Sequence, residues 1–281
     1  MEWPWSLPGS GISGIKFLGC KEEGSGRMLL AIDIGNTNIA LGVFEGRNLV
    51  HSWRVSTRKD QTADEYAVLC RNLFKLADLS MAEVESVVLC SVVPPLNDCF
   101  SILATQYFGV AGLFIEATEQ DLMPILYDPP SDVGADRIVD AIAAYRMYGG
   151  PSVVVDFGTA TTFDTISVDG EYLGGIIAPG IGVSADALFR QAAKLPRIEI
   201  KKPERAIGKS TVSSMQSGVF HGYVGLVEGV LERIKDELGP ASVTATGGYA
   251  ALIATGLSGF DQIEPDLTMH GLRICFEHMR P

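Results

Sequence analysis

The sequence predicts an α/β protein made of two similar lobes, and three observations lead to this fold class. A short apolar run followed by an aspartate, a glycine and small polar side chains occurs twice, once in each half of the chain. Each copy continues into alternating strand and helix patterns, which is typical of an α/β architecture. The length of 281 residues suits one large domain or two lobes of ordinary size. We therefore expect two mixed sheets flanked by helices, with a ligand site in the crevice between the lobes.

The first copy of the repeated pattern lies near the start of the predicted fold. Residues 29–32 are apolar and run directly into Asp33-Ile34-Gly35-Asn36-Thr37-Asn38, and residues 39–44 form a second strand-like run. A short apolar run that ends at such a turn is typical of a buried strand. The glycine permits a tight turn because it has no Cβ. Amide and hydroxyl groups in this turn can hold phosphate oxygens, and the aspartate can hold a hydrated cation.

The second copy has the same layout. Residues 153–155 run into Asp156-Phe157-Gly158-Thr159-Ala160-Thr161-Thr162, and residues 163–168 again read as a strand. Taken alone, each copy could be a β-hairpin whose aspartate only hydrogen-bonds its own turn, because aspartate and glycine are common turn residues. Two copies in the same context favour a clamp around a metal-bound polyphosphate.

The other elements follow in a similar order in the two halves. Apolar periodicity and the positions of proline and glycine are the signals used. In the first half they predict strands at 49–55, 84–93 and 113–115, and helices at 61–77 and 97–107. After a Pro-rich connection at 124–130 they predict helices at 133–148, 184–193, 211–238, 250–254 and 267–278, strands at 172–178 and 243–246, and a turn at 179–182. The expected organisation is a leader at 1–27 outside the fold, a first lobe at 28–132 and a second lobe at 133–281.

Composition excludes several classes of protein. A formal net charge of −12 argues against a general binder of nucleic acid or anionic membranes, whose surface would be basic. No apolar run approaches the ~20 residues of a membrane span. The five cysteines are odd in number and show no Cys-x-x-Cys spacing, so we expect free thiols in a reducing compartment rather than disulfides or a zinc site.

Five stretches, in order along the chain, give the sequence a specific resemblance. They are the two loops above, Gly134-Ala135-Asp136-Arg137, residues 174–180 and Thr246-Gly247-Gly248. With these motifs the chain resembles the acetate and sugar kinase, Hsc70 and actin superfamily, and within it the type III pantothenate kinases. The resemblance extends from Met28 nearly to the end. It implies duplicated actin-like (ribonuclease H-like) lobes and a cytoplasmic homodimer that phosphorylates pantothenate with ATP, the first step of coenzyme A biosynthesis, and needs no other protein.

The resemblance also implies roles for individual residues. Asp136 would be the catalytic base, and Asp156 would bind a monovalent cation, potassium or ammonium. Asp33 would lie near Mg²⁺. The residues implied to bind ATP are Asp33, Ile34, Gly35, Asn36, Thr37, Asn38, Ile39, Ala40 and Thr159. Those implied to bind pantothenate are Tyr127, Gly134, Ala135, Asp136, Arg137 and Thr211.

Simpler interpretations exist for several of these side chains. Asp136 could be a first-turn carboxylate stabilised by the helix dipole, worth about 0.3–1 kcal/mol, and Arg137 its surface neighbour. Otherwise Arg137 could pair with the pantothenate carboxylate as a two-pronged donor. Asp140, one turn further along, is expected to be solvated. Thr211 could be a helix N-cap without a ligand.

Three other functions remain open at this point. The first is a kinase of the same fold that acts on a sugar, another small alcohol or a carboxylate. The second is a non-catalytic regulator resembling Bvg accessory factor, which would bind ligand without phosphorylating it. The third is a filament or chaperone ATPase of the actin or Hsc70 type, for which the chain looks too short.

Overall fold

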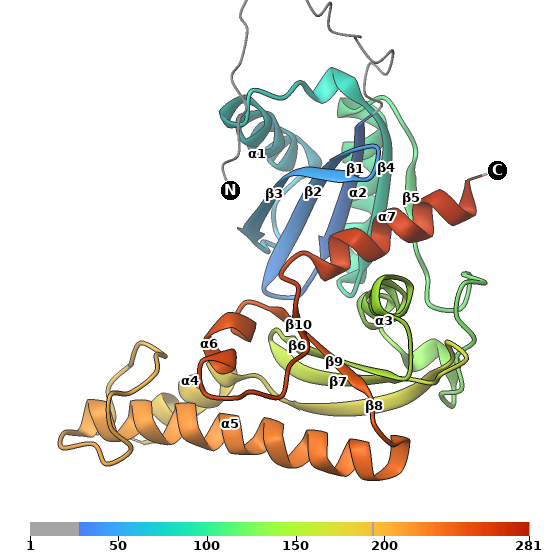
Figure 1. Ribbon diagram of the computed structural model, residues 1–281. Helices are drawn as coiled ribbons and strands as arrows, with labels where there is room; N and C mark the ends of the chain where they lie inside the picture. Colours follow the sequence, from blue (N-terminus) through green and yellow to red (C-terminus); the bar gives the residue numbers. More distant parts are fainter. Residues whose placement is uncertain (1–27, 193, 281) are drawn as a thin grey trace, which may run out of the picture.

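A computed structural model describes residues 28–192 and 194–280, and it contains two five-stranded sheets flanked by helices (Figure 1). The expected leader at 1–27 lies outside the described residues. The first sheet has the order β3-β2-β1-β4-β5. Its strands are β1 (Met28–Ile34), β2 (Asn38–Glu45), β3 (Asn48–Ser56), β4 (Val84–Ser91) and β5 (Gly112–Phe114).

The second sheet repeats the topology of the first. Its order is β8-β7-β6-β9-β10, with β6 (Ser152–Phe157), β7 (Ala160–Ile166), β8 (Tyr172–Pro179), β9 (Ser242–Gly247) and β10 (Gln262–Ile263). In both sheets the first three strands form an antiparallel meander, and two later strands add in parallel to the first. The predicted duplicated fold is confirmed. Only the two-residue β10 was not predicted, because it is too short to show a period.

Helices and sheets alternate in layers, with one core on the outer side of each sheet and one shared core between the two sheets (Figure 1). Helices α1 (Ala63–Leu76) and α2 (Asn97–Tyr107) cover the outer face of the first sheet. Helices α3 (Ala135–Tyr148) and α7 (Leu267–Met279) lie between the two sheets. The outer face of the second sheet is covered by α4 (Ile181–Gln191), α5 (Thr211–Leu238) and α6 (Ala250–Ala254). Short 3₁₀ turns occupy Met81–Glu83, Pro94–Leu96 and Pro130–Asp132.

One predicted helix boundary needs correction. Helix α4 begins at Ile181, inside the predicted turn, because Gly180 already has the extended backbone of an N-cap. Helix α7 packs on β1, β2 and β4 of the first sheet and on α3, although its residues belong to the predicted second lobe. The chain therefore returns to the first sheet with its last helix.

Local sequence accounts for the sharp ends of the helices. Thr62 caps α1 with a reciprocal pair of hydrogen bonds to Glu65, and Ser210 caps α5 in the same way with Ser213. Thr211 is the first residue of α5 and not its cap. None of the described helices combines the length and the apolar composition that a bilayer crossing requires.

Candidate functional site

A cleft of about 1070 Å³ lies where the two repeated loops face each other. Its walls come from both lobes and include Asp33, Thr37, Asp136, Asp156 and Thr159. The structure therefore brings together both loops and Asp136 of the tetrapeptide that begins α3, which are far apart in the sequence.

Strand alternation places the two loop aspartates on facing sides of the sheets. Successive side chains of a strand point to opposite faces. In β1, Leu30 and Ile32 pack beneath α1 and α2, so Asp33 falls on the opposite face, which is turned toward the second lobe. In β6, Val153 and Val155 pack beneath α5, so Asp156 points toward the first lobe.

The first loop is a tight turn supported by its neighbours. The Gly35 amide donates to the Asn38 carbonyl at 3.1 Å, and a methyl group on Gly35 would lie 2.8 Å from that carbonyl oxygen. The Thr57 hydroxyl donates to the Gly35 carbonyl at 2.6 Å. The turn therefore requires glycine, and Thr57, which directly follows β3, holds it in place.

The second loop is equally crowded. Gly247 has a φ of +86°, and a methyl group there would lie 2.3 Å from Oδ1 of Asp156. A methyl group on Gly180 would lie 2.3 Å from the Thr159 carbonyl oxygen. The family stretches 174–180 and 246–248 thus pack against the loop itself, and their glycines leave it room.

The two loops touch across the cleft. Oγ1 of Thr37 lies 2.7 Å from Oγ1 of Thr159, a hydrogen bond between residues 122 positions apart in the chain. Both hydroxyls belong to the expected ATP site. They lie where a phosphate chain between the lobes would meet both loops.

Asp136 sits in the first turn of α3 and lines the cleft. Its Oδ1 accepts the Arg137 amide at 2.8 Å, and a methyl group on Gly134 would lie 2.5 Å from the same oxygen. Burial raises the pKa of Asp136 above its usual value, and the Arg137 amide and guanidinium offset part of that shift. The first-turn interpretation and the base interpretation are therefore compatible, because the side chain accepts an amide of the first turn and also faces the cleft.

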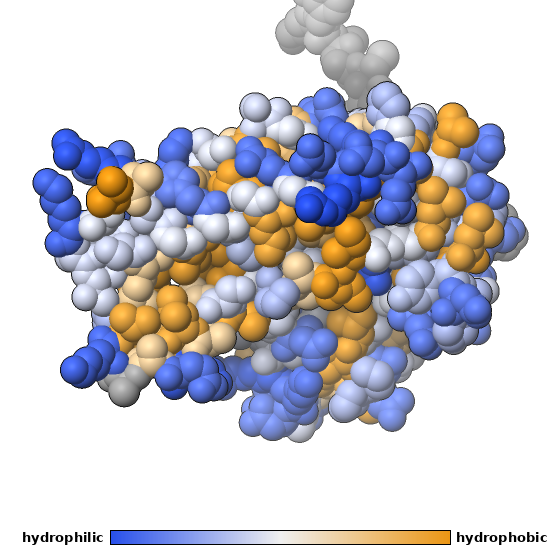
Figure 2. Space-filling model, turned by 90° about the horizontal axis from the view of Figure 1, so that it is seen from below, coloured by the Kyte–Doolittle hydropathy of each residue, from blue (hydrophilic) through white to orange (hydrophobic). Residues whose placement is uncertain are grey.

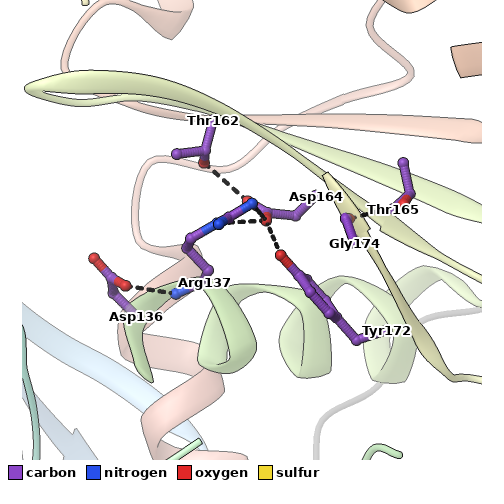
Figure 3. Close-up of polar contacts among 7 residues, drawn as sticks. All are labelled: Asp136, Arg137, Thr162, Asp164, Thr165, Tyr172 and Gly174. Carbon is purple, nitrogen blue, oxygen red and sulfur yellow. Dashed lines mark hydrogen bonds and ion pairs between the residues drawn. The ribbon is translucent and has the colours of Figure 1, made fainter. Parts of the chain in front are cut away.

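Arg137 binds a buried carboxylate that the sequence analysis missed (Figure 3). Its Nε and Nη2 each lie 2.7 Å from Oδ1 of Asp164 in β7. The Tyr172 hydroxyl donates to the same oxygen at 2.7 Å, and Thr162 donates to Oδ2 at 2.8 Å. The guanidinium is only 10% exposed, so it is not the surface group that one interpretation described. The signal in the sequence was the charged Asp164 within the strand-like run of residues 163–168.

The other expected substrate residues do not all meet at Asp136. Tyr127 lies beside Gly174 and packs on the central core, near this Arg137 network. Thr211 instead lines a separate cavity of about 780 Å³ with Leu188, Lys209 and Met215. Within a single chain, Thr211 therefore does not line the cleft that contains Asp136.

Asp140 is buried, which corrects the expectation that its side chain is solvated. It is 4% exposed rather than solvated, and its Oδ1 has no hydrogen-bond partner among the described residues. Burial and the neighbouring Asp156 raise its pKa well above the usual value. One turn of α3 separates it from Asp136, and this inward face of the helix lies between the two sheets.

The loop aspartates share this electrostatic environment. Burial first, and then the nearby Asp136, raise the pKa of Asp33 and that of Asp156 to about 7 each. Arg54 lowers both pKa values in part. A cationic ligand between these carboxylates would therefore be stabilised by their negative charge.

A pH dependence of stability follows for the ligand-free protein. With pKa values near 7 in the folded state and an ordinary value of 3.8, Asp33 and Asp156 bind more protons folded than unfolded. Their stabilising contribution is complete below pH ~4 and is lost as the pH rises to ~7. Urea unfolding of the ligand-free wild type and of Asp33→Asn/Asp156→Asn between pH 4 and 8 measures it. We expect the free energy of unfolding of the double variant to decline less, and parallel curves would contradict the shifts.

The donor set of the cleft fits the expected cations. Its ionisable ligands are carboxylates, which Mg²⁺ and other hard cations prefer. Among the described residues no group of three or more His, Cys, Asp or Glu side chains could hold a metal by itself. This suits Mg²⁺, which usually binds through one or two carboxylates together with substrate phosphates.

The fold and the cleft define the class of protein. The chain has the duplicated fold of the acetate and sugar kinase, Hsc70 and actin superfamily. Similar solved structures include a Campylobacter jejuni protein described as a Baf family transcriptional activator (TM-score 0.57, 20% identity, 89% of this chain and 98% of that one). Another is the activator of 2-hydroxyisocaproyl-CoA dehydratase from Clostridium difficile with bound ADPNP (TM-score 0.51, 13% identity, 89% and 95%). At these identities the similarity establishes the fold alone.

The sequence comparisons define the family. A family model described as type III pantothenate kinase matches residues 29–233. The type III pantothenate kinase of Moorella thermoacetica is 51% identical over 251 residues, which cover 89% of this chain and 99% of that protein. The chain belongs to the type III pantothenate kinase family, as the resemblance of its motifs implied.

Proposed function

We propose that the protein transfers the γ-phosphoryl group of ATP to the primary hydroxyl of pantothenate, giving 4′-phosphopantothenate for coenzyme A synthesis. The observation that carries this proposal is one cleft that holds both phosphate loops and Asp136, in a chain of this family. A phosphate chain held between the loops would have Asp136 beside it, where an acceptor alcohol needs a base.

Different residues of the cleft would have different roles in the reaction. Phosphoryl transfer depends mainly on positioning and on neutralising charge. The loop of residues 33–40 and Thr159 would position the triphosphate with their amides and hydroxyls. Asp136 would accept the proton of the pantothenate hydroxyl, and its raised pKa makes it a stronger proton acceptor than an ordinary aspartate. Tyr127 and residues 134–137 would hold pantothenate next to it.

Two cations complete the proposed site. Mg²⁺ would bind near Asp33 and supply charge neutralisation at the phosphates. Potassium or ammonium would bind at Asp156, whose carboxylate lies in the same cleft on the other lobe. The pKa values of both aspartates are raised in the ligand-free protein. A cation bound beside either carboxylate would lower its pKa again and favour the ionised form.

A coupled assay of ADP release tests the function and the monovalent cation together. With pantothenate, ATP and Mg²⁺, we expect turnover in K⁺ or NH₄⁺ and little in Na⁺ alone. Sugars and short carboxylic acids in place of pantothenate are the matched controls. Equal rates in K⁺ and Na⁺ would remove the cation from the proposal, and ATP binding without phosphorylation of pantothenate would favour the regulator instead.

We further propose a homodimer whose contact includes the lower face of the second lobe. Figure 2 shows apolar side chains gathered on that face. Exposed apolar residues on this side of the second sheet include Ile176 of β8, which pairs with Phe163 of the outer core, Leu188 of α4 and Val212 of α5. Exposed apolar patches of this kind are typical of interfaces. A second copy would also explain how Thr211, remote from Asp136 in one chain, could reach a pantothenate site.

Light scattering of the purified protein and a mixing experiment test the dimer. If Thr211 acts across the interface, Asp136→Asn and Thr211→Ala subunits, each with low activity, will regain part of it when unfolded and refolded together. A monomeric mass, or no recovery in the mixture, would refute the shared site.

The free cysteines, most of them buried, support a reducing cytoplasm as the location, and fractionation outside it would contradict this.

A further inference from the structure

Arg54 of β3 is the one basic side chain among the described residues that line the cleft. Five acidic residues line the same cavity: Asp33, Asp136, Asp156, Asp186 and Glu199. A triphosphate carries several negative charges, so its entry into such a cavity is unfavourable without cations. The loops supply neutral donors, and among the described residues of the wall this guanidinium is the one fixed positive charge.

The register of the first sheet explains how Arg54 reaches the site. Arg54 pairs with Ala40 across β3 and β2, and Ala40 pairs with Asp33 across β2 and β1. Residues paired across neighbouring strands have their side chains on the same face of a sheet. Because the middle residue of this row is alanine, a long side chain from β3 can extend over it toward Asp33 and the cleft.

The guanidinium also reaches the opposite lobe. A methyl group placed on Gly248, after β9, would lie 3.4 Å from Nη1 of Arg54. The side chain is exposed and makes no hydrogen bond or ion pair with another residue in the described part of the chain. Its five N–H donors are therefore available to a ligand held between the lobes.

We propose that Arg54 binds the triphosphate of ATP in the cleft, as a positioning residue that joins the first sheet to the Gly247-Gly248 turn through the nucleotide. The inference rests on the proposed function and assigns a specific phosphate-binding role within it. A guanidinium forms paired, charge-assisted hydrogen bonds with phosphate oxygens, and a lysine at the same place would supply only a point charge.

The main alternative is a structural role, in which Arg54 only balances the charge of Asp33 and Asp156. Both roles predict weaker ATP binding after removal of the guanidinium. The two roles differ for Arg54→Lys. Charge balance needs only a positive charge, so lysine would restore ATP binding in full, whereas paired hydrogen bonds to phosphate need a guanidinium. A folding defect, in contrast, would weaken adenosine as much as ATP.

The experiment compares Arg54→Ala, Arg54→Lys and Arg47→Ala by calorimetric titration with ATP and with adenosine, and by steady-state kinetics. Arg47 lies at the other end of the same hairpin and is 84% exposed, so its variant removes an equal charge away from the cleft. We expect Arg54→Ala to weaken ATP binding about 10- to 100-fold and adenosine less than about twofold. Arg54→Lys should recover part of the loss, the KM for pantothenate should stay near the wild-type value, and Arg47→Ala should bind ATP normally.

Each outcome decides the matter. Equal weakening of ATP and adenosine, full recovery of ATP binding in Arg54→Lys, or unchanged ATP binding in Arg54→Ala would overturn the proposal, as would a wild-type protein that does not bind ATP. A wild type that shows the expected binding contrast but never phosphorylates pantothenate would refute the proposed function and leave the role of Arg54 intact.

Discussion

Replacing Asp136 by asparagine is expected to lower kcat for pantothenate phosphorylation by about 100- to 10,000-fold, the range in which general bases contribute. Asparagine keeps the shape and can still accept the Arg137 amide hydrogen bond seen at 2.8 Å. It cannot take the proton of the acceptor alcohol. The KM for ATP should change little, because the phosphate loops are untouched.

Steady-state kinetics and urea unfolding measure this result together. The free energy of unfolding should remain within about 1 kcal/mol of the wild type, so that lost activity is not lost folding. Since the base must be ionised, wild-type kcat should also fall as the pH drops below the raised pKa of Asp136. Near-normal turnover in Asp136→Asn would exclude this residue as the base.

Replacing Asp164 by alanine is expected to reduce the free energy of unfolding by about 3–5 kcal/mol, as when one partner of a buried ion pair is removed. The Asp164 side chain is 1% exposed and accepts hydrogen bonds from Arg137, Tyr172 and Thr162. Without it, the guanidinium charge stays buried with no counterion. Because Arg137 is also part of the expected substrate site, the KM for pantothenate should rise.

Two further variants distinguish loss of the charge from loss of the hydrogen bonds, and a buried ion pair from an exposed one. Asp164→Asn keeps the hydrogen-bonding shape without the charge, so it should lose less stability than Asp164→Ala. Asp121→Ala removes an 83% exposed carboxylate paired with His278 and should cost no more than about 1 kcal/mol. If Asp164→Ala were as stable as Asp121→Ala in urea, the buried pair would not hold α3 to the second sheet as described.

The sequence predicted most elements because their signals are local. The capping pair Thr62 and Glu65 marks the start of α1, and the apolar period of 211–238 gives α5 its full length. The repeated loops predicted the duplication, and the family match predicted the class of reaction. Helix α4 began earlier than predicted, because glycine and proline before a helix resemble a turn when only the sequence is read.

By itself, then, the sequence determined the strands, the two glycine turns and the family, since each depends on neighbouring residues or on a motif. Only the tertiary structure decided which side chains meet. It paired Arg137 with Asp164, buried Asp140, placed Thr211 in another cavity and brought Arg54 to the cleft. The physical reason is that these contacts depend on strand register and on the packing of α3 and α7 between two sheets, which no short segment encodes.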